Sequence, residues 1–75
     1  MRDLVEFVAK SICDHPEEVV VTEIEEDGNI SIKLQVHPDD KGRVIGKRGR
    51  VAESVRVLLR VAAVKKGIRV NLEIV

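Results

Sequence analysis

A strict alternation of apolar and polar residues between two turn signals constrains the fold of this chain most strongly. Residues 30–37 read ISIKLQVH, so apolar side chains recur at every second position. This period of two predicts a β-strand that buries one face and exposes the other. Asp27-Gly28 before the strand is typical of a hairpin turn, and Pro38 breaks the strand at its other end. Such a strand needs a layer of helices over its apolar face.

Three further segments of the first half have clear patterns. Residues 2–13 place apolar side chains at helical spacing and predict an amphipathic helix that ends before the following proline. Residues 18–26 are β-branched and acidic, which predicts a strand on the other side of the hairpin turn. Asp39 or Asp40 is suited to cap a short helix that runs to Ile45.

The rest of the chain predicts one long helix and a closing strand. The helix begins after Gly49 and runs to about Lys66, and Gly67 is suited to its C-terminal cap. Residues 68–74 alternate like the central strand and predict a third strand. The element order α-β-β-α-α-β therefore predicts an α+β fold, with helices layered over three strands, in a single domain of residues 1–75.

Charge is distributed unevenly along the chain, although the net charge is zero. Residues 1–40 hold three basic and eleven acidic residues, a formal charge of −8. Residues 41–75 hold ten basic and two acidic residues, a formal charge of +8. The asymmetry points to a polyanion site in the second half, or to two solvated faces that partly neutralise each other. A single cysteine excludes an intramolecular disulfide, and no apolar run approaches a membrane span.

The segment GRVIGKRGR, residues 42–50, joins the two helices of the second half. Gly46 and Gly49 enclose Lys47 and Arg48, so bare backbone and positive charge coincide. The spacing does not match a nucleotide-hydrolysing phosphate loop, which follows a strand and requires Ser or Thr after its lysine. A clamp on a nucleic-acid backbone fits, because glycine admits phosphates and the next helix N-terminus adds N–H donors. The alternative is a plain helix–helix turn with glycine at its corner.

The motif VIGKRG, the element order and the length together resemble the bacterial type II KH domain. A stand-alone domain with this loop is similar to the KhpA family. The resemblance implies three helices packed on one face of a three-stranded sheet. It also implies a cytoplasmic protein that binds single-stranded RNA, or acts as an RNA chaperone, through a GXXG clamp on the RNA backbone. The implied assembly is a homodimer, or a heterodimer with a larger Jag-type KH protein (KhpB).

The resemblance also assigns the RNA-binding residues. The glycine loop is the clamp, the Val-Ile pair before it lines the groove floor, and the flanking arginines add positive charge. These predicted residues are Arg43, Val44, Ile45, Gly46, Lys47, Arg48, Gly49 and Arg50. Phe7 is the single aromatic residue, so an aromatic platform for stacking bases is excluded.

The long helix has a wider apolar surface than a one-sided sheet can cover. Counted at about 100° per residue, its apolar arc far exceeds the stripe that a surface helix needs. The excess can pack under the first helix, remain as scattered exposed residues, or bury against a second subunit. We predict a two-fold dimer centred on Leu58 and Val61, with Val57 and Val64 beside them.

No pattern in the chain predicts an enzyme, a metal site or a cofactor. His15 and His37 lack matching Cys or carboxylate spacing and are predicted to be surface histidines. Cys13 is predicted to be a small, partly buried residue and not a nucleophile. The main alternative function is a KH-type docking module with little RNA binding of its own. A DNA-binding helix-turn-helix fits poorly, because the long helix starts with few base-reading side chains.

Overall fold

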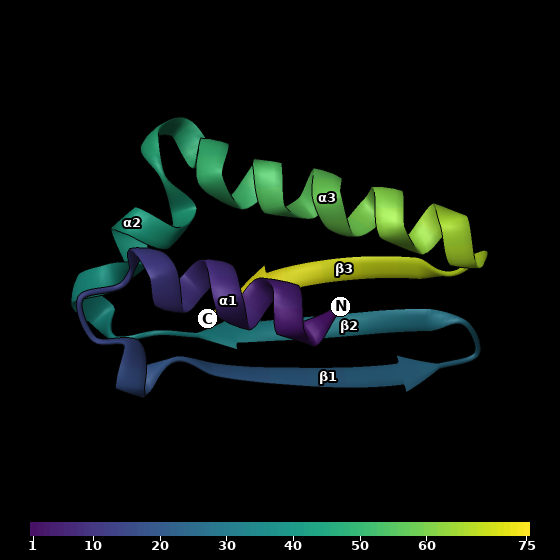
Figure 1. The fold of residues 1–75 in the computed structure, drawn as a ribbon, viewed down its shortest axis with the longest axis horizontal. Helices are drawn as coiled ribbons and strands as arrows, with labels where there is room; N and C mark the ends of the chain where they lie inside the picture. Colours follow the sequence, from purple (N-terminus) through teal and green to yellow (C-terminus); the bar gives the residue numbers. More distant parts are fainter.

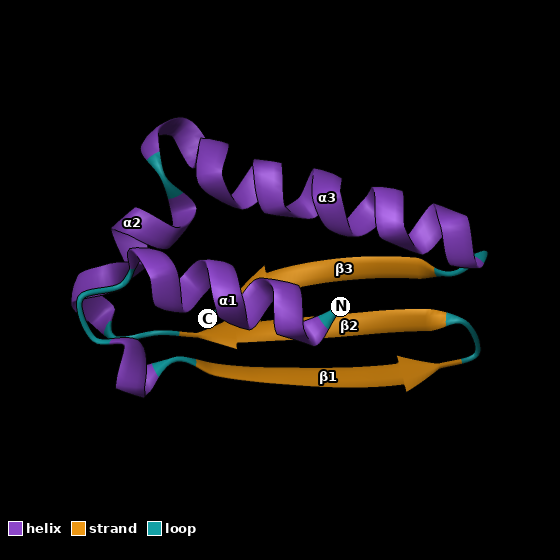
Figure 2. Ribbon diagram, viewed as in Figure 1, coloured by secondary structure: helices purple, strands orange, loops and turns teal.

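The computed structural model describes residues 1–75 and places three α-helices against a three-stranded sheet (Figures 1 and 2). The helices and strands are α1 (Arg2–Ile12), β1 (Val20–Glu26), β2 (Asn29–Gln35), α2 (Lys41–Ile45), α3 (Arg50–Lys66) and β3 (Arg69–Ile74). Short 3₁₀ turns lie between them, η1 (Pro16–Glu18), η2 (Pro38–Asp40) and η3 (Lys47–Gly49). The predicted element order and α+β class are confirmed. None of the helices has the length and apolar character that a membrane span requires.

The sheet has the order β1-β2-β3, with β1 antiparallel and β3 parallel to the central strand. Asp27 and Gly28 form the β1–β2 turn with φ angles of 48° and 78°. Two positive φ angles at these positions are typical of the type I′ turn, which matches the twist of a hairpin. The parallel strand β3 requires a crossover connection, and α2 and α3 provide it.

One face of the sheet is buried beneath α1 and α3, which lie lengthwise along the strands (Figure 1). In β2, Ile30, Ile32 and Leu34 are buried, whereas the alternating residues between them face the open side. Strand and helix side chains form one continuous apolar core. The predicted one-sided strand is therefore confirmed, and its apolar face is covered by helices.

Four predicted elements have different bounds in the structure. The central strand spans Asn29–Gln35 instead of 30–37, and the closing strand begins at Arg69 instead of Ile68. Two further differences have local reasons. Cys13 leaves the helix with extended backbone angles, so α1 ends at Ile12. The strand expected over residues 18–26 begins only at Val20. Pro16 occupies the first position of η1, where its fixed φ angle favours a tight turn. By contrast, Gly67 closes α3 in the left-handed conformation at φ 69°, as predicted.

Asp40 is the single buried charged residue, with 1% of its surface exposed. It occupies the N-cap position of α2, but its side chain makes no capping hydrogen bond there. Its carboxylate instead accepts the backbone N–H groups of Asp14 at 3.0 Å and His15 at 2.9 Å. Burial alone would raise the pKa of Asp40, yet these bonds and two nearby histidines outweigh it and hold the pKa below its usual value. We call these contacts the Asp40 junction, because they join the α1–β1 loop to the start of α2.

Candidate nucleic-acid interface

The loop between α2 and α3 turns sharply at Gly46. This residue has φ 80° and ψ 169°, and its N–H donates to the carbonyl oxygen of Gly42 at 2.8 Å. A Cβ atom at position 46 would collide with the Val51 side chain and lie 2.8 Å from the Val51 backbone nitrogen. Glycine is therefore required by the packing of the loop against α3, whether or not a ligand approaches.

Gly49 differs from Gly46, because the space around it is open. Its φ angle of 73° is left-handed, but a Cβ atom there would meet no atom within 4 Å. Arg48 also adopts a left-handed conformation, at φ 58°, which costs a non-glycine residue about 1–2 kcal/mol. The N–H of Gly49 donates to the carbonyl oxygen of Gly46 at 3.0 Å and fixes the turn. A ligand can thus reach the main chain at Gly49.

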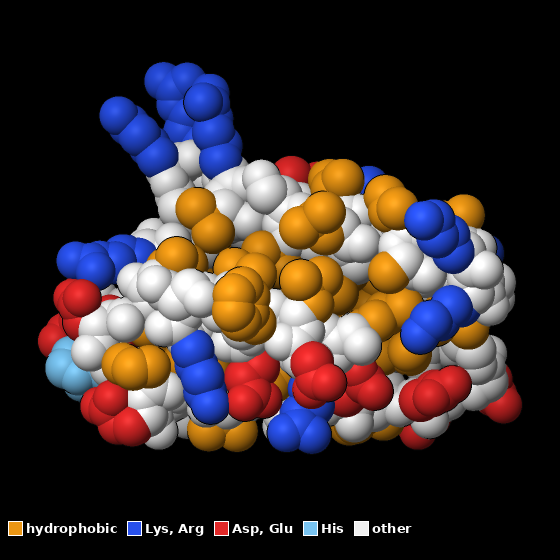
Figure 3. All heavy atoms as spheres, viewed as in Figure 1, with side chains coloured by type: hydrophobic (Ala, Val, Ile, Leu, Met, Phe, Trp, Pro, Cys, Tyr) orange, Lys and Arg blue, Asp and Glu red, His pale blue; other side chains and the backbone are white.

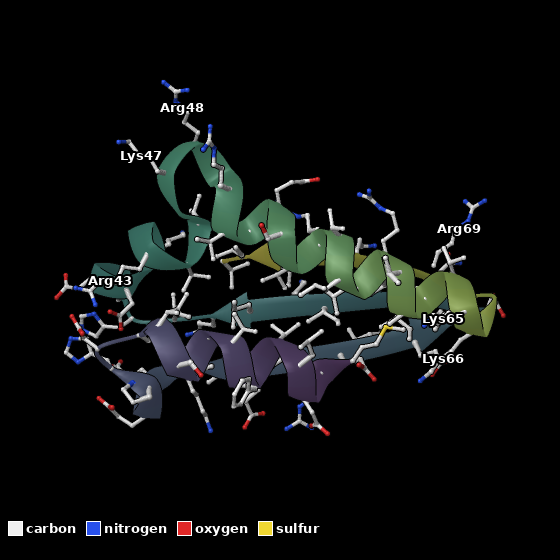
Figure 4. The ribbon with its side chains drawn as sticks, turned by 45° about the horizontal axis from the view of Figure 1, so that its top comes forward. Arg43, Lys47, Arg48, Lys65, Lys66 and Arg69 are labelled. Atoms are coloured by element: carbon white, nitrogen blue, oxygen red, sulfur yellow. The ribbon has the colours of Figure 1, made fainter.

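Positive side chains project from this loop and remain unpaired. Lys47, Arg48 and Arg50 are exposed, and none of them lies within ion-pair distance of a carboxylate. Lys and Arg side chains stand above the α2–α3 loop in Figure 3, and Lys47 and Arg48 point away from the body of the molecule in Figure 4. We call these three residues the tip cluster. Its charges are available to an anionic partner.

The other predicted RNA-binding residues are not all brought to the tip. Val44 is only 4% exposed and belongs to the core, which corrects the expectation that it lines a groove. Ile45 is 37% exposed and remains accessible. Arg43 lies apart from the tip cluster in Figure 4, and its Nη1 atom pairs with Asp14 Oδ1 at 2.9 Å. Both partners are exposed, so this pair is weak.

Sequence reasoning missed a hollow of about 150 Å³ between α3 and the edge strand β3. It is lined by Arg56, Leu59, Arg60, Val70, Asn71 and Leu72. The guanidinium of Arg56 donates to the carbonyl oxygen of Leu72 from Nε at 3.4 Å and from Nη2 at 3.3 Å. Arg56 and Arg60 are four residues apart and therefore lie on the same face of one helix. This spacing was the sequence signal that could have indicated the hollow. The hollow combines an apolar floor with guanidinium and amide groups at its rim.

The two histidines form a cluster that the sequence did not predict. The rings of His15 and His37 stack with centroids 4.0 Å apart, and both residues are half-buried. Donor atoms of His15, His37 and Asp39 lie within 4.8 Å of one another. However, His37 Nδ1 already accepts the N–H of Asp39 at 3.0 Å, and Nε2 faces the Glu18 carboxylate at 3.6 Å. We assign the cluster a structural role beside the Asp40 junction.

Cys13 is half-buried next to the same junction. Burial, followed by the nearby charges of Asp40 and Asp14, raises the pKa of its thiol. A raised pKa keeps the thiol protonated, which disfavours a nucleophilic role. The expectation of a small, partly buried cysteine is confirmed.

Residues 2–74 match the family model described as KhpA/KhpB, KH domain. The chain belongs to this KH-domain family. The KhpA/KhpB match includes the α2–α3 loop and the α3–β3 hollow, so both are part of the shared domain. The type II KH fold expected from the sequence is therefore confirmed.

Curated relatives match over the whole domain. The chain is 45% identical over 75 residues to the RNA-binding protein KhpA of Clostridium acetobutylicum, covering 100% of both chains. It is 44% identical to the RNA-binding protein KhpA of Clostridium perfringens, again over 100% of both. It is 41% identical to the RNA-binding protein KhpA of Listeria monocytogenes, covering 100% of this chain and 99% of the relative. These relatives are bacterial proteins named for RNA binding.

Proposed function

We propose that this protein is a non-catalytic, cytoplasmic RNA-binding domain that holds single-stranded RNA at the α2–α3 loop. The observation that carries the proposal is the tip cluster, three exposed and unpaired cations beside the open backbone of Gly49. Phosphate oxygens are suitable partners for these cations. The names of the KhpA relatives support RNA as the polyanion.

Three features of the loop act together on the RNA backbone. The absent side chain at Gly49 lets a phosphate approach the main chain. The N-terminus of the 17-residue helix α3 adds N–H dipoles and a partial positive charge. The tip cluster contributes direct ionic contacts, each adding a log–log salt slope of roughly −0.7 on a single strand. Such binding tolerates many sequences, which suits an RNA chaperone.

We assign the bases to the α3–β3 hollow. Leu59 and Leu72 supply an apolar floor, and Arg60 and Asn71 supply polar groups for base edges. This arrangement suits a chain whose single aromatic residue, Phe7, lies on α1. Bases would be held by aliphatic contacts and hydrogen bonds instead of aromatic stacking.

The outward face of α3 supports a two-fold dimer as the second part of the proposal. The buried stripe of α3 is Ala52, Val55, Leu59 and Ala63. The four residues predicted for the interface, Val57, Leu58, Val61 and Val64, are between 43% and 71% exposed. An apolar helix face of this kind is suited to a second copy of the domain or to a related KH protein of the KhpB type. The same face favours the alternative function, a docking module with little RNA affinity.

RNA binding is tested by fluorescence anisotropy with labelled single-stranded and duplex RNA. A lone domain should bind a single strand with a dissociation constant on the order of 1 μM or weaker, in preference to duplex. The double variant Lys47→Asp, Arg48→Asp should lose binding while its circular dichroism spectrum stays native. Lys33→Asp, Lys41→Asp is the matched control, with two exposed lysines outside the tip cluster. Unchanged affinity in the folded tip variant would overturn the proposal.

The dimer is tested by sedimentation equilibrium. Wild type should be dimeric at high micromolar concentration, and Val61→Asp should be monomeric. Val20→Asp is the matched control, because Val20 on β1 is 51% exposed and Val61 is 52% exposed. A wild-type monomer would remove the dimer from the proposal. A stable wild-type dimer that binds no RNA would favour the docking module.

A further inference from the structure

The strand β1 forms one margin of the sheet, and its outer edge is unpaired. In the order β1-β2-β3 it pairs with β2 alone, and Figure 1 shows no strand alongside its other edge. An antiparallel neighbour uses the backbone groups of every second residue, so about three N–H and three carbonyl groups of this strand point outward. Apart from the sheet, no hydrogen bond of the protein reaches the backbone of residues 20–26. These outward groups are free to pair with a further strand.

The opposite margin of the sheet, formed by β3, is partly covered. The carbonyl oxygen of Leu72 accepts hydrogen bonds from the Arg56 guanidinium at 3.4 Å and 3.3 Å. Proteins commonly protect an outer strand with proline, lysine, a bulge or a covering element. The strand β1 has neither proline nor lysine, and its register with β2 is continuous over all seven residues, so it carries no bulge. Negative charge is therefore the protective feature that remains.

Three glutamates give β1 this negative charge, namely Glu23, Glu25 and Glu26. None of them lies within ion-pair distance of a basic side chain. Figure 3 shows Asp and Glu side chains along the margin where β1 lies in Figure 1. Like charges placed opposite one another destabilise a strand pair, so a second copy of β1 is disfavoured as the partner. A phosphate backbone is also repelled, whereas a strand that carries Lys or Arg is attracted.

Two of the glutamates point to the side of the sheet that the helices cover. In the antiparallel register, Glu23 is opposite Ile32 and Glu25 is opposite Ile30, and both isoleucines are buried. Residues that are directly opposite in such a pair point to the same face. In agreement, the Glu23 carboxylate accepts the backbone N–H of Arg2 at the start of α1, at 3.2 Å.

The open side of β1 is apolar where the helix-covered side is acidic. Val20 and Ile24 are opposite Gln35 and Ser31, which lie on the open face of the sheet. Their exposed fractions are 51% and 49%. Because the side chains of an added strand also alternate between the two faces, the matching strand has basic residues on one face and apolar residues on the other.

We propose that β1 binds an extended basic segment of another protein, which joins the sheet as a fourth strand. The segment carries Lys or Arg at every second position, beside Glu23 and Glu25, and aliphatic side chains between them, beside Val20 and Ile24. Backbone hydrogen bonds supply affinity in this mode of recognition, and the alternating side chains supply specificity. This activity does not depend on RNA binding at the α2–α3 loop, which lies in the oppositely charged half of the chain.

The test is fluorescence anisotropy of a labelled nine-residue peptide of alternating lysine and valine, at low ionic strength. Wild type should bind this peptide with a dissociation constant on the order of 100 μM. A peptide of the same composition, with its valines grouped at one end, should bind at least about tenfold more weakly. The double variant Glu23→Lys, Glu25→Lys should also lose at least about tenfold in affinity for the alternating peptide.

The matched control for the charge reversal is Glu53→Lys, Glu73→Lys. Both residues are exposed and lie outside β1, so this variant makes the same change of net charge elsewhere. Its affinity for the alternating peptide should fall less than about twofold. An equal loss in both double variants would show attraction by net charge alone and would overturn the inference.

Two methylated peptides separate strand pairing from charge attraction and use the wild-type protein. Methyl groups on the backbone nitrogens of either the lysines or the valines leave the charge unchanged, but they remove the N–H donors along one edge of the peptide strand. One methylated peptide should lose binding and the other should retain it, because a single edge of the added strand faces β1. Equal affinity of the two methylated peptides, or no binding of the unmethylated one, would contradict strand addition.

Amide shifts of the ¹⁵N-labelled protein locate the occupant of the edge. Added peptide should shift the amides of residues 20–26 and leave those of residues 46–50 in place. Shifts of the β1 amides on raising the protein concentration without peptide would assign the edge to a second copy. Shifts of the same amides with a four-nucleotide RNA would assign it to RNA. Either of these two results would overturn the inference.

Discussion

The Asp40 junction and the α2–α3 loop lie at opposite ends of α2, and charge has a different role in each. At the junction, a buried carboxylate accepts two backbone N–H groups and holds two loops together. At the loop, packing of Gly46 against Val51 fixes the backbone, and the tip cluster points outward. Charges that are used inside the fold stabilise it, whereas charges left outside are available to a partner.

The same contrast separates the two halves of the chain. In the first half, Arg2 and Lys10 both pair with Glu6 on α1. Of the ten basic residues in 41–75, only Arg43 forms an ion pair. A net charge of zero therefore conceals a set of free cations around α3. Net charge alone would have excluded nucleic-acid binding, but the distribution of ion pairs favours it.

The largest effect is expected from breaking the loop itself with Gly46→Ala. The added methyl group collides with Val51, and alanine must also adopt the positive φ angle of this position. The midpoint of thermal unfolding should therefore fall by about 15 °C or more. Gly42→Ala is the control, because a Cβ atom there meets nothing within 4 Å and the residue lies in α2. Circular dichroism melts measure both variants. Equal stability of the two variants would contradict the packing role of Gly46.

Asp40→Asn should break the junction and leave the loop intact. Asparagine has the same shape, but its amide group cannot accept both N–H groups, so the unfolding midpoint should fall by about 5–10 °C. Asp39→Asn, in the neighbouring exposed residue, is the control and should melt like wild type. RNA affinity measured well below the melting temperature should not change in either variant. Lost affinity in folded Asp40→Asn would show that the two ends of α2 are not independent.

The smallest expected effect is the pH dependence of the difference in stability between wild type and Asp40→Asn. The pKa of Asp40 in the folded protein lies below its usual value of 3.8. A lowered pKa means that the carboxylate stabilises the fold above the unfolded pKa, and this stabilisation is lost as the pH falls through the folded pKa. The stability gap between wild type and Asp40→Asn should therefore be present at about pH 5 and above and shrink below about pH 4. Urea titrations across this range measure it, and a gap that persists in strong acid would contradict the role of the charge.

The periodic parts of the fold could be predicted from the sequence. The alternation of residues 30–37 and the helical spacing of α3 each arise because one face of the element is buried. The order of apolar and polar residues along the chain shows such a face directly. The bonds of Asp40 could not be predicted, because they join residues 25 and 26 positions apart. The stacking of His15 on His37 depends on the same long-range approach.

The candidate site was predicted in part. Position in the glycine motif selected Lys47, Arg48 and Arg50 as candidate RNA-binding residues, and the structure leaves these three side chains exposed and unpaired at the tip. The motif did not show that the Val44 side chain is buried in the core, because its burial depends on how α2 packs against the rest of the domain. The α3–β3 hollow arises where a helix meets an edge strand, and no local pattern encodes that contact. The sequence alone suggests phosphate access as the reason for glycine at position 46, whereas the close contact with Val51 gives a reason within the fold.

The most direct test of the central claim is an NMR titration of the ¹⁵N-labelled protein with a four-nucleotide single-stranded RNA. The free cations at the α2–α3 loop predict that backbone amides of residues 46–50 shift first and most, followed by those lining the α3–β3 hollow. Amides of the Asp40 junction and of Lys33 on the open face of the sheet should remain in place. Shifts concentrated on β1 or on the outward face of α3, with residues 46–50 unchanged, would contradict the account.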